Sequence, residues 1–127
     1  MEYFDYRRNM ESKTATSALS ALAHEGRLGA FCLLVRAGPA GLAAGEIARR
    51  LKVPPNSLSS NLGILSQAGL ISSRREGRSI IYSAHYGAMA ALLGFLVEDC
   101  CEGAAEVCAP LYAALARTGR CAPAASA

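Results

Sequence analysis

The spacing of apolar residues changes from helical to strand-like after residue 69 and returns to helical after His85. Before that point, apolar residues recur at every third or fourth position, which is typical of amphipathic helices. Four helices are therefore predicted, and they start near Ser12, Leu28, Ala43 and Ser57. A further helix is predicted from His85 to about Asp99.

Two β-type runs occupy residues 70–75 and 79–84, and Glu76-Gly77-Arg78 lies between them. A short connection that contains glycine favours a hairpin, because glycine readily adopts the positive φ that tight turns need. The order helix, helix, short helix, turn, helix, hairpin, helix predicts a winged helix-turn-helix, a mainly α fold with a two-stranded β-hairpin. In this fold the second helix of the short pair enters the DNA major groove.

The longest apolar run, residues 88–97, has ten residues, whereas a membrane helix needs about twenty. No apolar stretch follows Arg7-Arg8, so a secretory signal is not supported. We expect a cytoplasmic protein without a membrane partner. An odd number of cysteines in such a chain predicts reduced thiols rather than a disulfide framework, and the five are Cys32, Cys100, Cys101, Cys108 and Cys121.

Basic residues concentrate in the middle of the chain, although the net charge is only +3. Residues 49–78 contain six arginines and lysines against one acid, Glu76. Such a segment predicts a polyanionic partner. The acids that follow predict a cationic or regulatory contact, and they are Glu98, Asp99, Glu102 and Glu106.

The predicted helix at 57–68 has one apolar face and one face of small polar side chains. Leu58, Leu62 and Leu65 point inward, and at 100° per residue the opposite face holds Ser57, Ser60, Gly63, Ile64 and Gln67, with Ser59 and Asn61 at its edges. Hydroxyls and amides suit phosphates and base edges, and arginines on the hairpin suit phosphates. The predicted contacts to double-stranded DNA are Ser57, Ser59, Ser60, Asn61, Gln67, Arg74, Arg75 and Arg78.

Residues 21–83 resemble the ArsR/SmtB family of metal- and metalloid-responsive repressors. The resemblance rests on Ala-His-Glu-x-Arg-Leu within 21–28, on GEIARRL and PPNSLSSNL, and on the GLISSRREGRSIIYS wing. It implies a homodimer whose first and post-wing helices form the interface, and repression until an inducer binds. We therefore expect Met89, Leu92 and Leu96 to be buried between two copies. The family commonly has bulkier, cationic or histidine residues where this chain has Ser60, Asn61 and Gly63.

Three cysteines, Cys100, Cys101 and Cys108, lie in EDCCEGAAEVC after the post-wing helix. Trivalent arsenic or antimony takes three soft thiolates in a pyramid, so this triad predicts a site for an As(III), Sb(III) or organoarsenical inducer. Gly103 would let the helix fray so that adjacent cysteines converge. The triad also resembles that of arsenic-responsive family members whose cysteines follow this helix.

Other interpretations of the cysteines are a zinc site and a thiol redox switch. Zinc needs four ligands, and only His24, His85 and the nearby acids are available to complete them. We expect His24 at a helix junction, Cys32 in the core and no assigned role for Cys121. An enzyme is not expected, because acids rather than an oxyanion loop surround the cysteines, and no organic cofactor is expected.

Four segments are predicted along the chain. They are an N-terminal arm (1–11), a winged helix-turn-helix domain for DNA binding and dimerisation (12–103), a C-terminal helix with part of the metalloid site (104–117), and a disordered tail (118–127).

Overall fold

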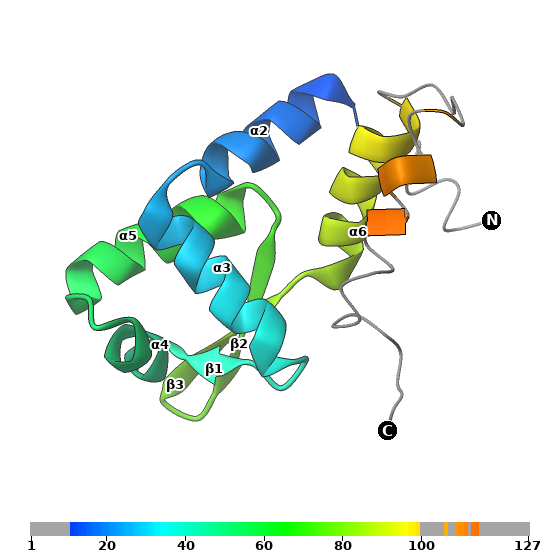
Figure 1. Cartoon of the computed structure of the whole chain (residues 1–127). Helices are drawn as coiled ribbons and strands as arrows, with labels where there is room; N and C mark the ends of the chain where they lie inside the picture. The colour runs from blue at the N-terminus through cyan, green and yellow to red at the C-terminus, as the bar shows by residue number, and fades with distance from the viewer. Residues whose placement is uncertain (1–10, 100–105, 107–108, 112, 115–127) are drawn as a thin grey trace. The chain divides into compact units, whose positions relative to one another are not determined.

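Helix α2 (Ser12–Leu22) and helix α3 (Glu25–Ala37) open the described part of the computed structural model (Figure 1). The structure describes residues 11–99, 106, 109–111, 113 and 114. The chain divides into two compact units, residues 1–92 and 93–127, and each is described separately. The predicted arm, the boundary at 103–104 and the tail lie outside the described residues, apart from Glu11.

Small residues on α2 let it lie close to its neighbours. Ala15, Ala18 and Ala21 are its buried residues, and α2 contacts both α3 and α5 (Pro55–Gln67). The helical segment is interrupted at residues 23–24, between α2 and α3 and just before Gly26, where the sequence predicted the interruption. The break falls there because His24 Nδ1 accepts a hydrogen bond from the Gly26 amide at 3.1 Å and caps α3. His24 is therefore a helix-junction residue, as predicted.

The core of the first unit lies among α3, α5 and the helix α4 (Ala44–Leu51). Leu34, Ile47, Leu62 and Leu65, one or two from each of these helices, are almost completely buried. The helix α5 starts at Pro55, two residues before the predicted Ser57, because the fixed φ of proline suits the first turn of a helix.

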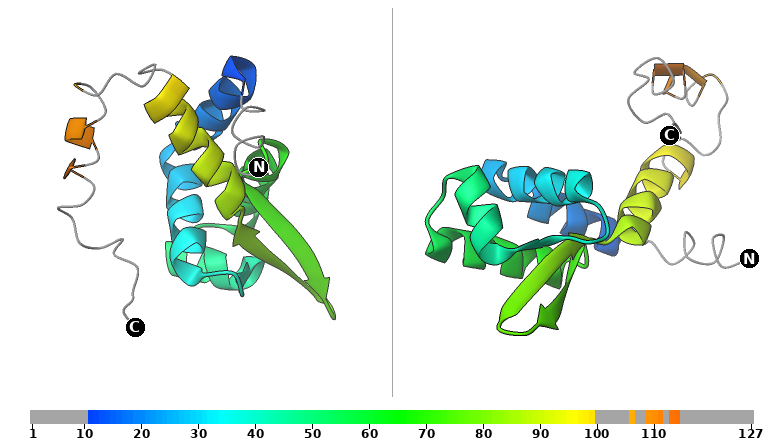
Figure 2. Two further views of the ribbon diagram at one scale, coloured as in Figure 1. Left: turned by 90° about the vertical axis from the view of Figure 1, so that its right-hand side faces the viewer. Right: turned by 90° about the horizontal axis from the view of Figure 1, so that it is seen from below.

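The wing is an antiparallel hairpin of β2 (Ile71–Glu76) and β3 (Ser79–Ala84). Glu76 pairs with Ser79, which leaves Gly77-Arg78 as a two-residue turn, and Gly77 has φ +63°. A strand that the sequence analysis did not predict, β1 (Leu42–Ala43), pairs with β3, so the sheet order is β1-β3-β2. The winged helix-turn-helix prediction is confirmed with this added strand. Figure 2 shows the hairpin projecting away from α3, α4 and α5.

Helix α6 (Tyr86–Gly94) follows the wing and ends in a π-helical turn, Phe95–Asp99. His85 extends the pairing of β2 with β3 by one step, because its amide donates to the carbonyl of Leu70, the residue before β2, at 2.8 Å. Its Nδ1 atom accepts from the Ala88 amide at 2.9 Å and caps α6. The Tyr86 hydroxyl donates to the Val35 carbonyl at 3.0 Å, which joins α6 to α3.

Two residues have environments other than those predicted, Leu92 at a dimer interface and Cys32 in the core. Leu92 is only 5% exposed within the single chain, so a monomer already buries it, whereas its neighbour Leu93 is 51% exposed. Cys32 is half-buried rather than a core residue, because the buried face of α3 is formed by Ala30, Phe31 and Leu34.

Within the described residues, no single helix is long and apolar enough to cross a membrane. In the described part of the chain, one pair of helices, α2 and α3, would together be long and apolar enough, but they are bent by 100° relative to each other.

Candidate nucleic-acid interface

The reading face predicted for α5 is exposed in the structure. Leu58, Leu62 and Leu65 are buried, and this fixes the rotation of the helix about its axis. Ser57, Ser59, Ser60 and Gln67 are consequently exposed to solvent. Hydroxyl and amide groups on one face of this helix could reach base edges and phosphates if α5 lay in a major groove.

Asn61 has a different environment from the serines. It is half-buried, and a Cβ atom built on Gly26 would lie 3.0 Å from its Nδ2 atom. The Asn61 side chain therefore lies against the start of α3 instead of projecting freely from the reading face. For the predicted base contact the Asn61 side chain would have to leave this position, whereas the serines are already exposed.

Gln67 lines a surface groove of about 270 Å³. The groove is lined by Ser17 and Ser20 of α2, Arg27 of α3, and Ile64 and Gln67 of α5, among others. Arg27 Nε donates to the Ala21 carbonyl at 2.6 Å, which ties the start of α3 to the end of α2. Ser17, Ser20 and Arg27 were not predicted from the sequence, because helical spacing does not show which helices converge.

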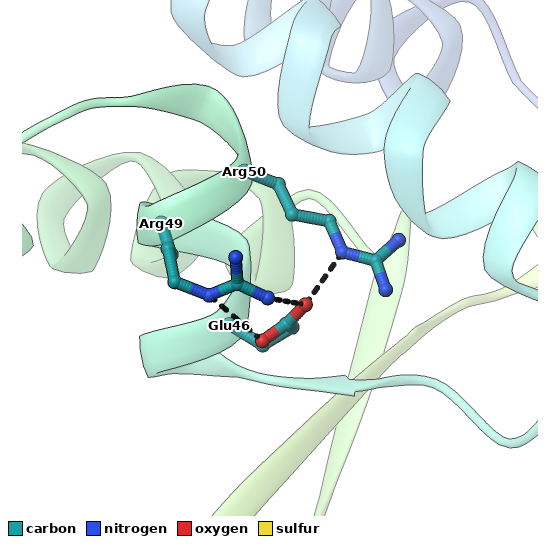
Figure 3. Close-up of polar contacts among 3 residues, drawn as sticks. All are labelled: Glu46, Arg49 and Arg50. Carbon is teal, nitrogen blue, oxygen red and sulfur yellow. Dashed lines mark hydrogen bonds and ion pairs between the residues drawn. The ribbon is translucent and has the colours of Figure 1, made fainter.

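On α4, one carboxylate holds two guanidiniums (Figure 3). Arg50 Nε lies 2.7 Å from Glu46 Oε2, Arg49 Nε lies 3.3 Å from Oε1, and Arg49 Nη2 also contacts Oε2. Hydrogen bonds from Arg49 and then Arg50 lower the pKa of Glu46 from its ordinary 4.5 to about 2. Glu46 lies just before the basic segment 49–78, so its single negative charge offsets one of the two positive charges of Arg49 and Arg50.

This ion-pair cluster predicts a pH dependence. Because the pKa of Glu46 is lowered on folding, its bonds stabilise the fold fully above pH 4.5. The stabilisation is lost as the pH falls toward 2. Glu46→Gln should therefore unfold at lower urea concentration than the parent at pH 7, and the difference should shrink toward zero between pH 4.5 and 2. Glu25→Gln is the control, since Glu25 has no ion pair within the described residues. A difference for Glu46→Gln that is independent of pH would contradict this assignment.

The three wing arginines differ in their contacts. Arg74 Nε is 2.8 Å from Glu76 Oε2, and Arg74 Nη2 donates to the Ala40 carbonyl at 2.8 Å. Arg75 and Arg78 are exposed, and the side chain of neither has a hydrogen-bond or ion-pair partner in the part of the chain that the structure describes. Two of the three guanidiniums are thus available to phosphates without breaking an existing bond.

The wing arrangement yields a prediction on salt dependence. Arg75→Ala and Arg78→Ala should each weaken binding to operator and random DNA about equally, because phosphate contacts carry no sequence information. Each should also reduce the slope of log K against log salt by about 0.9, the value for one phosphate contact. Fluorescence anisotropy at several salt concentrations measures both effects. A relaxed base preference at one position with an unchanged slope would instead show that the wing reads bases.

The cysteines predicted to hold an inducer, Cys100, Cys101 and Cys108, lie outside the described residues, as does Cys121. Among the residues that the structure describes, no group of three His, Cys, Asp or Glu side chains could hold a metal ion. Both histidines use Nδ1 to cap helices.

A short helix pair, α4 and α5, followed by an antiparallel wing defines a winged helix-turn-helix DNA-binding protein. Residues 22–74 match a family model described as a helix-turn-helix domain. The chain is 31% identical over 90 residues to the HTH-type transcriptional regulator YgaV of Escherichia coli, covering 71% of this chain and 89% of YgaV.

Solved structures agree with this class. Reduced HlyU from Vibrio cholerae is 29% identical with a TM-score of 0.55, over 66% of this chain and 87% of that one. The Mycobacterium bovis protein Mb0332 is described as a homodimeric winged helix-turn-helix DNA-binding domain of a possible ArsR-family transcriptional regulator. It is 28% identical with a TM-score of 0.55, over 68% of this chain and 80% of that one. The chain belongs to the ArsR family of winged helix-turn-helix transcriptional regulators. It is a DNA-binding regulator and not an enzyme, as predicted.

Proposed function

We propose that the protein is a cytoplasmic, dimeric repressor that leaves its operator when As(III) or Sb(III) binds Cys100, Cys101 and Cys108. The observation that carries the proposal is the sequence EDCCEGAAEVC, which begins within the π-helical turn Phe95–Asp99. Three thiolates match the coordination number and softness of trivalent arsenic. Capture of arsenite, As(OH)3, by three thiols would form three As–S bonds and break three As–O bonds, and the thiol protons would leave with the hydroxyl groups as three waters.

In the proposed complex, α5 lies in the major groove and the wing lies along the backbone. Ser57 and Ser60 would face base edges, because both are exposed on the side opposite the leucine stripe. Arg75 and Arg78 would contact phosphates, because both guanidiniums extend from the hairpin without partners in the described structure. Each protomer would read one half of an operator with twofold symmetry.

The proposed dimer couples the cysteines to DNA. Mb0332, with the same fold, is homodimeric, and α6 of this chain carries the exposed Leu93 a few residues before the cysteines. A metalloid bound directly after this helix would change the geometry of an interface that sets the spacing of the two reading helices. A coupling of about 1–3 kcal/mol, or about 5- to 150-fold in affinity, is sufficient for induction.

The proposal is tested by titrating the reduced protein with arsenite, first free and then bound to its operator. We expect one arsenic per protomer in native mass spectrometry, the loss of three titratable thiols, and DNA release at the same stoichiometry. Zinc is titrated in parallel. Binding of zinc but not arsenite, with DNA release, would replace the proposed inducer, and turnover of an arsenic compound would overturn the classification as a regulator.

Thiol oxidation is the second candidate, and one feature of the described structure favours it. Cys32 on α3 is a free, half-buried thiol, and the relative HlyU has been solved in a form described as reduced. Two thiols and one hydrogen peroxide would give a disulfide and two waters. If peroxide releases DNA, dithiothreitol reverses the release and arsenite has no effect, the oxidation model replaces the metalloid model.

A further inference from the structure

Arg74 links the two edges of the sheet. It lies on the edge strand β2 opposite Ile81 of β3, and Ile81 is paired on its other side with Ala43 of β1. The Arg74 guanidinium donates to the carbonyl of Ala40, in the loop that leads into β1, at 2.8 Å. Its side chain therefore crosses β3, and Glu76 holds it from the same strand at 2.8 Å.

The loop that receives Arg74 also contacts the wing directly. Gly41 has φ +74°, and a Cβ atom built on it would lie 2.3 Å from the Tyr82 carbonyl oxygen of β3. A turn from Gly38 to Gly41, closed by a 3.0 Å backbone hydrogen bond, presents both Ala40 and Gly41 to the sheet. Two independent contacts thus join the same loop to β2 and β3.

We propose that Arg74 and the loop 38–41 form a wing strap that fixes the angle of the hairpin before DNA binds. The inference rests on the proposed DNA-binding mode and deepens it, because it makes Arg74 a positioning residue and leaves the phosphate contacts to Arg75 and Arg78. An isolated two-stranded hairpin is only marginally stable in water, and β1 pairs with β3 only at Ile81 and Tyr82. The turn end of the hairpin, toward Gly77-Arg78, has no pairing with β1, so its orientation depends on the contacts made at Ile81 and Tyr82.

The strap contributes to geometry more than to global stability. The Arg74 and Glu76 side chains are 44% and 57% exposed, and exposed ion pairs contribute little to the free energy of unfolding. Preorganisation has a different effect, since a wing already held in its bound orientation loses less conformational entropy on binding. Removing the strap should therefore loosen the base of the wing and weaken DNA binding, with little change in the melting temperature.

Hydrogen exchange on the protein without DNA tests the strap itself. Arg74→Ala should increase amide exchange at least about fivefold in residues 41–43 and 80–83, as expected when a charge-assisted hydrogen bond is lost. Arg75→Ala is the matched control and should leave exchange in these segments unchanged, because Arg75 lies next to Arg74 on β2 and its side chain has no hydrogen-bond or ion-pair partner in the described structure. Equal exchange in both variants would overturn the strap.

Two glycines of the same loop supply a second matched pair. Gly38 and Gly41 both have positive φ, so alanine strains the backbone at either position, but only Gly41 contacts the wing. Gly41→Ala should reproduce the faster exchange in residues 80–83, whereas Gly38→Ala should not. Faster exchange in both variants would assign the effect to loop strain and contradict the proposed contact.

A double-mutant cycle on DNA tests the positioning role. Arg78→Ala should weaken binding about fivefold in the parent and less than about twofold in the Arg74→Ala background, because a misplaced wing no longer delivers Arg78 to its phosphate. Additive losses, with a salt slope lower by about 0.9 for Arg74→Ala alone, would make Arg74 a phosphate contact and overturn the inference. If the parent binds no DNA, the binding mode fails while the exchange experiment still decides whether the strap exists.

Discussion

Replacing Cys100, Cys101 or Cys108 with serine should abolish release by arsenite while leaving operator affinity close to that of the parent. A pyramidal arsenic site loses one of three bonds with each substitution, since a serine hydroxyl neither ionises at neutral pH nor matches a soft ligand preference. The DNA-reading residues on α5 and the wing are unchanged in these variants. Fluorescence anisotropy of labelled operator at increasing arsenite measures the effect, and the coupling expected for the parent is about 5- to 150-fold.

The other two cysteines serve as controls for this result. Cys121→Ser and Cys32→Ala should respond to arsenite like the parent, although Cys32→Ala should lose some stability because the side chain is half-buried on α3. Cys108→Ser should still respond to a monomethylated arsenical, which has two open positions that Cys100 and Cys101 can fill. If Cys108→Ser responds to arsenite while Cys121→Ser does not, the third ligand is Cys121 and the proposed triad is wrong.

Apolar spacing predicted the helix-turn-helix and wing well because burial imposes that spacing. Leu58, Leu62 and Leu65 were expected to face inward and are buried, and their burial determines which polar residues α5 exposes. The hairpin was predicted from two β-type runs around a glycine, and its turn is the Gly77-Arg78 pair. The strand β1 is two residues long, which is too short for a period of two to be recognised.

Contacts between distant elements were not predictable from spacing. Asn61 lies at an edge of the α5 face, and only the structure shows that the start of α3 occupies that edge at Gly26. Arg74 donates to a backbone carbonyl 34 residues away, for which no side-chain pattern gives a signal. Glu46 is an exception that could have been found, because its partners follow at three and four residues, the spacing of ion pairs on a helix.

The burial of Leu92 within one chain makes Leu93 the better residue for testing the predicted dimer interface. Met89, Leu92 and Leu96 were expected to be exposed in a monomer, but Leu92 is part of the chain's own core. A single charged substitution there should unfold the protein, so a loss of dimers would not identify an interface. The exposed leucine of α6 is Leu93, one position along the helix, and it provides a probe that leaves the core intact.

Leu93→Glu should convert a dimer to a monomer and reduce operator affinity by at least about 100-fold, because two linked reading helices bind far more tightly than one. Helix α6 has no charged residue from Tyr86 to Gly94, and its own chain buries only Ala91 and Leu92. A helix that is apolar on all sides is normally buried on all sides, and a second copy of α6 would cover the exposed leucine. Sedimentation velocity at micromolar concentration and anisotropy with the operator measure the two effects.

Leu28→Glu is the matched control, since Leu28 on α3 is 46% exposed, close to the 51% of Leu93, and lies outside the predicted interface. It adds the same charge to the same residue type at similar exposure, so it should remain dimeric. Its operator affinity should fall only by the small amount that one added negative charge costs through repulsion of the DNA. If Leu93→Glu stays dimeric and binds like the parent, α6 is not the interface. If the parent itself sediments as a monomer while binding its operator tightly, the reading helices act singly and the coupling of the cysteines to DNA must lie within one protomer.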